Sequence, residues 1–142
     1  MKKTMTLLVA LMATLLLTNT AFAGAKCPQK RATKNAPANI AGKDNTAKAN
    51  KANGEKLYQK TAKPMACQMC HGKTGGGDGK LGKALKPAPR NFACADTMKD
   101  VSAGQMFWII KNGSKGTGMA PMKLKDKEIW DVVKYIREDL MK

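Results

Sequence analysis

The stretch Cys67-Gln68-Met69-Cys70-His71 is the most specific pattern in this 142-residue chain. It has the form C-x-x-C-H, the spacing of covalent haem c attachment. Two thiols three residues apart on a helical turn can reach the two vinyl groups of one porphyrin, and the next histidine then lies beneath the iron as an axial ligand. Because His71 is the only histidine in the chain, no other imidazole competes for that position. The pattern predicts one covalently bound haem c with its iron.

Other uses of a cysteine pair fit the sequence less well. A structural zinc site needs four ligands, commonly from two paired motifs, whereas Cys27 and Cys94 are isolated in the sequence. A thioredoxin-like redox pair needs alternating strands and helices, and no such alternation is visible. A disulfide within the motif would leave His71 without a role. The haem interpretation is favoured, with a basic zinc-binding protein as a remote alternative.

The composition is consistent with a small domain built around a cofactor. Aromatic residues make up only 5% of the chain, and a length of 142 residues favours one domain. So few large side chains make a thin core, which usually needs a staple, a metal or a cofactor. This argues against a large catalytic fold, and a single long apolar run argues against a membrane-spanning protein. We expect a protein that is not an enzyme.

The first 23 residues have the pattern of a secretory signal peptide. Lys2 and Lys3 precede an apolar run from Leu7 to Leu17, and Ala21-Phe22-Ala23 has small residues at the two positions that a signal peptidase recognises. The apolar run is too short to favour an uncleaved anchor helix. We expect cleavage after Ala23 and export to the periplasm. The 26 basic residues then become 24 against 10 acidic ones, a net charge of about +14 instead of +16.

Residues 24–52 are predicted to form a basic, flexible linker. This segment is rich in Ala, Lys and Asn and has one clear large aliphatic residue, Ile40. It therefore cannot bury enough apolar surface to offset its ordering entropy. Its net charge is about +6, which also allows an electrostatic arm for an anionic surface or partner. The folded domain is expected at residues 53–142, with a net charge of about +8.

The remaining apolar pattern predicts helices and no strand. Residues 53–60 form a short helix, and Ser102 with Gln105 is a capping-box pattern that begins a second helix ending at Asn112-Gly113. The last helix carries one apolar face at three- and four-residue spacing: Ile129, Val132, Val133, Ile136 and Leu140. The expected fold class is all-α.

A second axial ligand is expected from the methionines. Met119 lies in a glycine-rich segment, residues 113–122, between two predicted helices. Glycines let this backbone pass close to the edge of a haem, and Pro121 stiffens it. Met122 is the alternative ligand, whereas Met106 lies in an apolar helix and is interpreted as core.

In their order and spacing, the motif, the predicted helices and the methionine segment resemble those of the class I, monohaem c-type cytochromes, over roughly residues 53–141. Besides the motif, the likeness rests on Gly54–Tyr58, Gly75–Gly79, Pro87–Phe92, Phe107–Gly113, Gly118–Pro121 and Asp126–Ile136. The resemblance implies the cytochrome c fold, short helices wrapped around one haem. It implies thioether bonds to Cys67 and Cys70, and His71 and Met119 as the ligands of the iron.

The resemblance also implies details of packing. The first and last helices should cross near Gly54, with Tyr58 and either Tyr135 or Trp130 nearby. A proline carbonyl, from Pro87 or Pro89, should orient the histidine ring. Two departures concern Met119, which is followed by Ala120 where the family often has proline, and the last helix, where Lys125 replaces the usual Ser or Thr. We therefore keep Met122 as the alternative ligand and expect Asp126 to cap the helix.

The expected function is one-electron transport between redox proteins, as in a respiratory chain. The basic surface should dock on acidic faces of a donor dehydrogenase or reductase and of an acceptor oxidase or reductase. Export argues against nucleic acid as a partner, and any membrane contact should be peripheral. The alternative is a five-coordinate haem protein that binds gas or peroxide. Cys27 and Cys94 could form a disulfide, remain free or bridge two molecules, and spacing alone does not decide.

Overall fold

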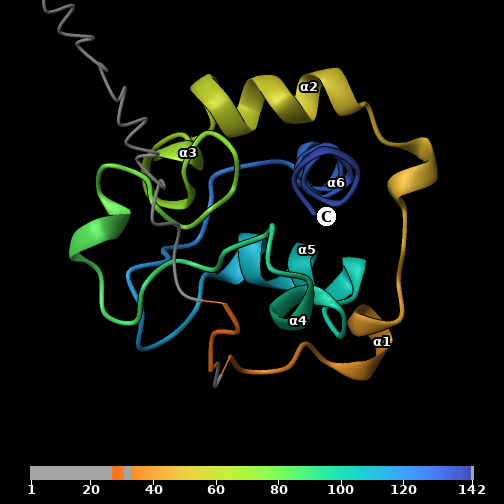
Figure 1. Cartoon of the computed structure of the whole chain (residues 1–142). Coiled ribbons are helices and arrows are strands. Elements are labelled where there is room, and N and C mark those ends of the chain that lie inside the picture. The colour runs from red at the N-terminus through yellow and green to blue at the C-terminus, as the bar shows by residue number, and fades with distance from the viewer. Residues whose placement is uncertain (1–26, 31–32, 142) are drawn as a thin grey trace, which may run out of the picture.

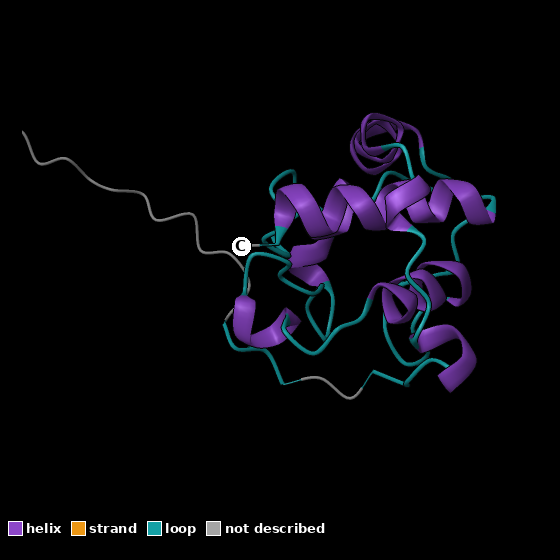
Figure 2. Ribbon diagram, turned by 90° about the vertical axis from the view of Figure 1, so that its right-hand side faces the viewer, coloured by secondary structure: helices purple, strands orange, loops and turns teal. Residues whose placement is uncertain are grey.

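The computed structural model describes residues 27–30 and 33–141, and all of its regular elements there are helical (Figure 1, Figure 2). The elements are α1 (Ala38–Ala41), η1 (Thr46–Lys48), α2 (Lys51–Lys56), η2 (Leu57–Thr61), α3 (Gln68–His71), η3 (Gly82–Ala84), α4 (Ala95–Met98), α5 (Ala103–Asn112), α6 (Asp126–Tyr135) and η4 (Ile136–Leu140). The all-α prediction is confirmed. The signal peptide expected at residues 1–23 lies outside the described residues. Within them, no helix has the length and apolar character needed to cross a bilayer.

The α2 and α6 helices cross in direct backbone contact. Figure 1 shows α2 lying across the view with α6 seen end-on beneath it. A Cβ added to Gly54 would overlap the carbonyl group of Asp131, so only glycine allows this approach. The fully buried Asp131 carboxylate accepts hydrogen bonds from the Asn50 backbone N–H at 2.7 Å and the Asn53 side-chain amide at 2.8 Å. The helix crossing expected at Gly54 is confirmed.

The core forms between α6, α5 and the α2–η2 helix. The apolar face predicted for the last helix is buried, with Ile129, Val132 and Val133 fully enclosed. Tyr58 packs against Tyr135 with ring centroids 5.4 Å apart. Of the two partners that we expected for Tyr58, the ring contact is therefore with Tyr135, whereas Trp130 stacks on Phe107 of α5 at 4.5 Å. A ring of helices thus surrounds the middle of the domain.

Residues 33–52 are packed against the domain, so the flexible linker predicted for 24–52 is wrong over this part. Ala36 is buried, and α1 lies along α5. A Cβ on Gly104 would overlap the Ile40 carbonyl, which shows how closely the two backbones approach. The Gln105 side chain accepts from the Ala36 N–H at 2.6 Å and donates to the Lys34 carbonyl at 3.0 Å. Backbone hydrogen bonds and close packing of small residues replace the large apolar side chains that this segment lacks.

A disulfide ties the start of this segment to the domain. Cys27 and Cys94 are bonded with their Cα atoms 5.7 Å apart, which settles the pairing that the sequence left open. We call residues 27–30 and 33–36 the N-terminal arm. The remaining residues of the expected linker, 24–26 and 31–32, lie outside the described residues.

The N-terminal cap of α5 agrees with the sequence prediction only in part, and the N-terminal cap of α6 differs from it. Ser102 caps α5 by accepting from the Gln105 N–H at 3.1 Å, but the Gln105 side chain bonds the arm instead of returning to Ser102. The cap of α6 is Lys125 and not Asp126. The Glu128 carboxylate accepts from the Lys125 N–H at 2.8 Å, while Asp126 forms an ion pair with Lys111. An acidic side chain in the first turn thus supports a lysine cap.

Candidate cofactor site

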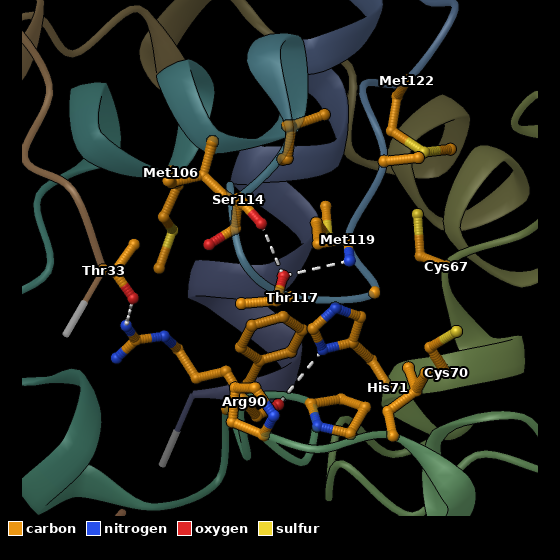
Figure 3. A pocket seen from close by; sticks show the side chains of 18 of the residues that line it. Thr33, Cys67, Cys70, His71, Arg90, Met106, Ser114, Thr117, Met119 and Met122 are labelled. Carbon is orange, nitrogen blue, oxygen red and sulfur yellow. Dashed lines mark hydrogen bonds between the residues drawn. The ribbon is translucent and has the colours of Figure 1, made fainter. Parts of the chain in front are cut away.

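An apolar cavity of about 460 Å³ lies in the middle of the fold (Figure 3). Its volume is within the range of small-molecule and cofactor sites. Five predicted site residues line it together: Cys67, Cys70, His71, Met119 and Met122. Segments far apart in the sequence therefore meet here, since α3, the loop before α6 and the N-terminal arm all contribute to its wall.

The two motif cysteines lie on one helical turn. The N–H groups of Cys70 and His71 both donate to the Cys67 carbonyl, at 3.2 and 2.9 Å. Both thiols are free, unlike the disulfide-bonded pair. Burial, with a smaller contribution from Cys70, raises the pKa of Cys67 to about 12, and burial also raises the pKa of Cys70. Two reduced thiols thus line an apolar cavity, as thioether attachment requires.

A glycine-rich loop holds this short helix in place. The C-terminal carbonyls of a helix lack partners within the helix. Here Gly77 donates to the His71 carbonyl at 2.8 Å and Gly79 donates to the Cys70 carbonyl at 3.1 Å. Gly72 ends the helix with φ of +80°, a conformation that favours glycine. The loop therefore stabilises a turn that would be too short to persist alone.

The His71 ring is oriented by a backbone carbonyl and an aromatic ring. Its Nδ1 lies 3.1 Å from the Arg90 carbonyl oxygen, and the ring stacks on Phe92 with centroids 4.6 Å apart. A carbonyl can only accept, so Nδ1 carries the proton and Nε2 carries the lone pair. Metal-binding histidines commonly have this arrangement.

The proline carbonyl that we expected to orient His71 is not the acceptor. The acceptor is the carbonyl of Arg90, one residue after Pro89. The Pro89 carbonyl instead accepts from the Gln29 side-chain amide at 3.0 Å. Sequence alone could not place this contact, because it depends on how the N-terminal arm meets the loop.

The loop that carries Met119 is held by local hydrogen bonds. Ser114 donates its N–H to the Met119 carbonyl at 2.9 Å. The Met119 N–H donates to the Thr117 hydroxyl at 3.1 Å, a bond drawn in Figure 3. Gly113 has φ of +73°, and a Cβ there would lie 2.6 Å from the Met119 carbonyl oxygen. The glycine-rich sequence therefore serves the close approach that we inferred for it.

Both candidate methionine ligands reach the cavity. Met119 and Met122 are partly buried and line its wall. The Met122 N–H donates to the Ile110 carbonyl at 3.0 Å, which fixes its backbone at the end of α5. Met106 is buried, as expected for core, and also borders the cavity. Geometry thus brings together every predicted ligand, including the alternative, and the choice of Met119 stays a prediction.

Sequence reasoning missed several residues of this site. Lys30 and Thr33, from the supposed linker, line the cavity. The Arg90 guanidinium donates to the Thr97 carbonyl and to the Thr33 hydroxyl, each at 3.1 Å. Tyr58 is fully buried, and its hydroxyl donates to the Gly72 carbonyl at 2.9 Å. A polar arm held mainly by hydrogen bonds and one disulfide has no apolar periodicity, so the sequence carries no periodic signal for it.

The residues present fit a covalently bound haem. Two free thiols, an imidazole with its Nδ1 proton engaged and a methionine thioether face one apolar cavity. Haem iron accepts such nitrogen and thioether ligands. Across residues 27–30 and 33–141, no three His, Cys, Asp or Glu side chains gather as metal ligands. Nothing in that part of the chain thus supports the zinc alternative.

Comparisons with known proteins agree with this chemistry. The family described as cytochrome c oxidase, cbb3-type, subunit III matches residues 49–136. None of the curated proteins compared with the chain matches it. A solved chain of the reducing HAO-like protein complex of Kuenenia stuttgartiensis has a TM-score of 0.53 and 24% identity, over 64% of this chain and 43% of that one. The chain thus spans less than half of that neighbour, and the likeness extends to the fold alone.

Proposed function

The chain belongs to the c-type cytochrome family of cbb3-type cytochrome c oxidase subunit III, and on that premise we propose that it is a periplasmic carrier of single electrons. Cys67 and Cys70 would hold one haem c through thioether bonds, and His71 and Met119 would ligate its iron. The observation that carries the proposal is the convergence of these four side chains on one cavity, with the His71 ring held by the Arg90 carbonyl.

The protein supplies a rigid ligand set. When bound, the haem supplies an iron centre that gains or loses one electron. His71 is oriented by Arg90 and Phe92, and Met119 by its hydrogen-bonded loop, so neither ligand needs to move when the charge changes. A thioether ligand raises the reduction potential of the iron. If His71 and Met119 both ligate the iron, a substrate would find no free position on the metal, which argues for a carrier and against an enzyme.

The partners we propose are redox proteins with acidic faces. The chain carries 26 basic and 10 acidic residues, so an acidic partner is attracted over a long range. Lysines near the methionine loop are candidates for docking, but Lys111 already pairs with Asp126 at 2.7 Å. Lys115 and Lys123 are exposed and remain candidates.

Export to an oxidising compartment is supported by cysteine usage. Disulfides persist in the periplasm and are rare in the cytoplasm. Cys27 and Cys94 form one, while the haem-motif cysteines are free. Together with the signal pattern before Ala23, this supports the proposed periplasmic location.

A visible spectrum of the exported protein tests the proposal. We expect a haem c spectrum in both oxidation states, and in the oxidised form the band that reports iron–methionine bonding in the cytochromes that the chain resembles. His71→Ala should abolish stable holoprotein. Met119→Leu should remove the methionine band, whereas Met122→Leu, the matched control on the same cavity, should keep it. If the methionine band is lost in Met122→Leu and kept in Met119→Leu, Met122 is the ligand instead of Met119. If the band is absent from the wild type, a five-coordinate haem is favoured.

A further inference from the structure

The Gln29 side chain holds the backbone on both sides of the residue that orients His71. Its Nε2 donates to the Pro89 carbonyl at 3.0 Å, and its Oε1 accepts from the Asn91 N–H at 2.9 Å. Between these two bonds lies Arg90, whose carbonyl accepts from His71 Nδ1. One amide thus uses a donor and an acceptor to fix three consecutive residues.

Gln29 is itself anchored at two points. Its backbone N–H donates to the Thr97 hydroxyl at 3.0 Å, and two residues earlier Cys27 is bonded to Cys94. Thr97 also accepts from the Arg90 guanidinium through its carbonyl, at 3.1 Å. The arm, α4 and the loop of residues 89–91 are therefore linked by covalent and hydrogen bonds into one unit.

The arm meets the side chain of Arg90 as well as its backbone. The guanidinium donates to the Thr33 hydroxyl at 3.1 Å, a bond drawn in Figure 3. Any displacement of the arm would thus act on Arg90 from two directions. Such a displacement would reach His71 through the hydrogen bond from its Nδ1 to the Arg90 carbonyl.

We propose that Gln29 is a positioning residue for His71, acting through the Arg90 carbonyl; this rests on the proposed function, since it takes His71 as the iron ligand. A carbonyl fixed beside Nδ1–H raises the basicity of the ring nitrogen that binds the metal. A more basic ligand stabilises the more positive, oxidised iron. Gln29 therefore holds the reduction potential lower than it would be with a loosely placed carbonyl.

The test compares holoproteins that differ at one glutamine. In Gln29→Ala we expect a higher midpoint potential in a redox titration, and faster solvent exchange of the His71 Nδ1 proton by NMR of the reduced protein. The methionine band should persist, because Met119 is untouched. Gln29→Glu keeps the acceptor for Asn91 and loses the donor to Pro89, so its rate of Nδ1 proton exchange should lie between those of the wild type and Gln29→Ala. Its potential is not compared, because the added negative charge lowers the potential directly.

A second glutamine provides the matched control. The Gln59 amide also makes two hydrogen bonds, to the Lys73 carbonyl at 2.9 Å and the Tyr135 hydroxyl at 3.0 Å, and does not line the cavity. Gln59→Ala should lower thermal stability without moving the potential or the proton exchange. A role for Gln29 in stability alone would make the two variants behave alike.

Two results would overturn the inference. One is an unchanged potential and proton exchange in Gln29→Ala, and the other is an equal shift in the Gln59 control. If Gln29→Ala does not accumulate as holoprotein, Gln29→Glu gives the comparison of proton exchange, with one hydrogen bond retained. Failure of the proposed function is distinguishable, because the wild type itself would then lack the histidine–methionine spectrum before any variant is made.

Discussion

At the scale of single residues, the fully buried Tyr58 joins the helical core to the haem motif. Its hydroxyl donates to the carbonyl of Gly72, the residue that ends α3, and its ring contacts those of Tyr135 and Phe92. Tyr58→Phe would remove one of two donors to that carbonyl, which also accepts from the Gly75 N–H at 3.2 Å. We expect a loss of about 1 kcal/mol in unfolding free energy, measured by denaturant titration. Tyr135→Phe is the control; it breaks a bond to the partly exposed Gln59 and should cost less.

The same residue gives a prediction about alkaline pH. Burial raises the pKa of Tyr58 above its ordinary value of 10.0. Above pH 10 the unfolded chain loses this proton while the folded protein keeps it, so unfolding becomes easier as pH rises, by up to about 1.4 kcal/mol per pH unit. Phe cannot ionise. The stability gap between wild type and Tyr58→Phe should therefore narrow above pH 10, and a gap that stays constant to pH 11 would contradict the burial of the hydroxyl.

At the scale of elements, the α2–α6 crossing depends on Gly54, which has no Cβ. A Cβ on Gly54 would overlap the Asp131 carbonyl, which is backbone and cannot rotate away. Gly54→Ala should therefore destabilise the holoprotein by several kcal/mol or prevent its accumulation, although alanine is the better helix former. Gly42→Ala is the control, because its Cβ would only make an ordinary contact with Ala38 at 3.7 Å. Equal melting temperatures for the two variants would refute the crossing.

The sequence predicted the elements that depend on residues close together in the chain. It missed the contacts that depend on residues far apart in the chain. The turn of Cys67–His71, the cap at Ser102 and the apolar face of α6 follow from spacing alone, and the structure has all three. The arm is different. Its order comes from bonds between residues more than 55 positions apart, such as Gln29 to Pro89 and Thr33 to Arg90. Such contacts produce no periodic pattern in the sequence. The contact between the Arg90 carbonyl and His71 produces none either.

At the scale of the whole molecule, the disulfide closes the chain around the cavity. Cys27 and Cys94 are 67 positions apart, so their bond removes much conformational freedom from the unfolded chain. Chain-entropy reasoning gives about 4 kcal/mol for a loop of this length. Replacing both cysteines by serine should lower the melting temperature of the holoprotein by roughly 15 °C. The haem spectrum should survive, because Cys67, Cys70 and His71 are untouched; an unchanged melting temperature would mean that the bond does not form.

The net charge makes a second prediction at this scale, on the rate of electron transfer. If Lys115 and Lys123 dock acidic redox partners beside the methionine loop, Lys115→Glu/Lys123→Glu should slow bimolecular transfer to an acidic partner roughly fivefold at low salt and weaken its dependence on ionic strength. Lys43→Glu/Lys48→Glu changes the net charge equally, but these exposed lysines lie around η1 and do not line the cavity. Stopped-flow rates of electron transfer, measured over a series of salt concentrations, distinguish a local docking face from attraction by the total charge. A local docking face requires the first pair to matter more, whereas equal slowing would mean that only the total charge attracts the partner.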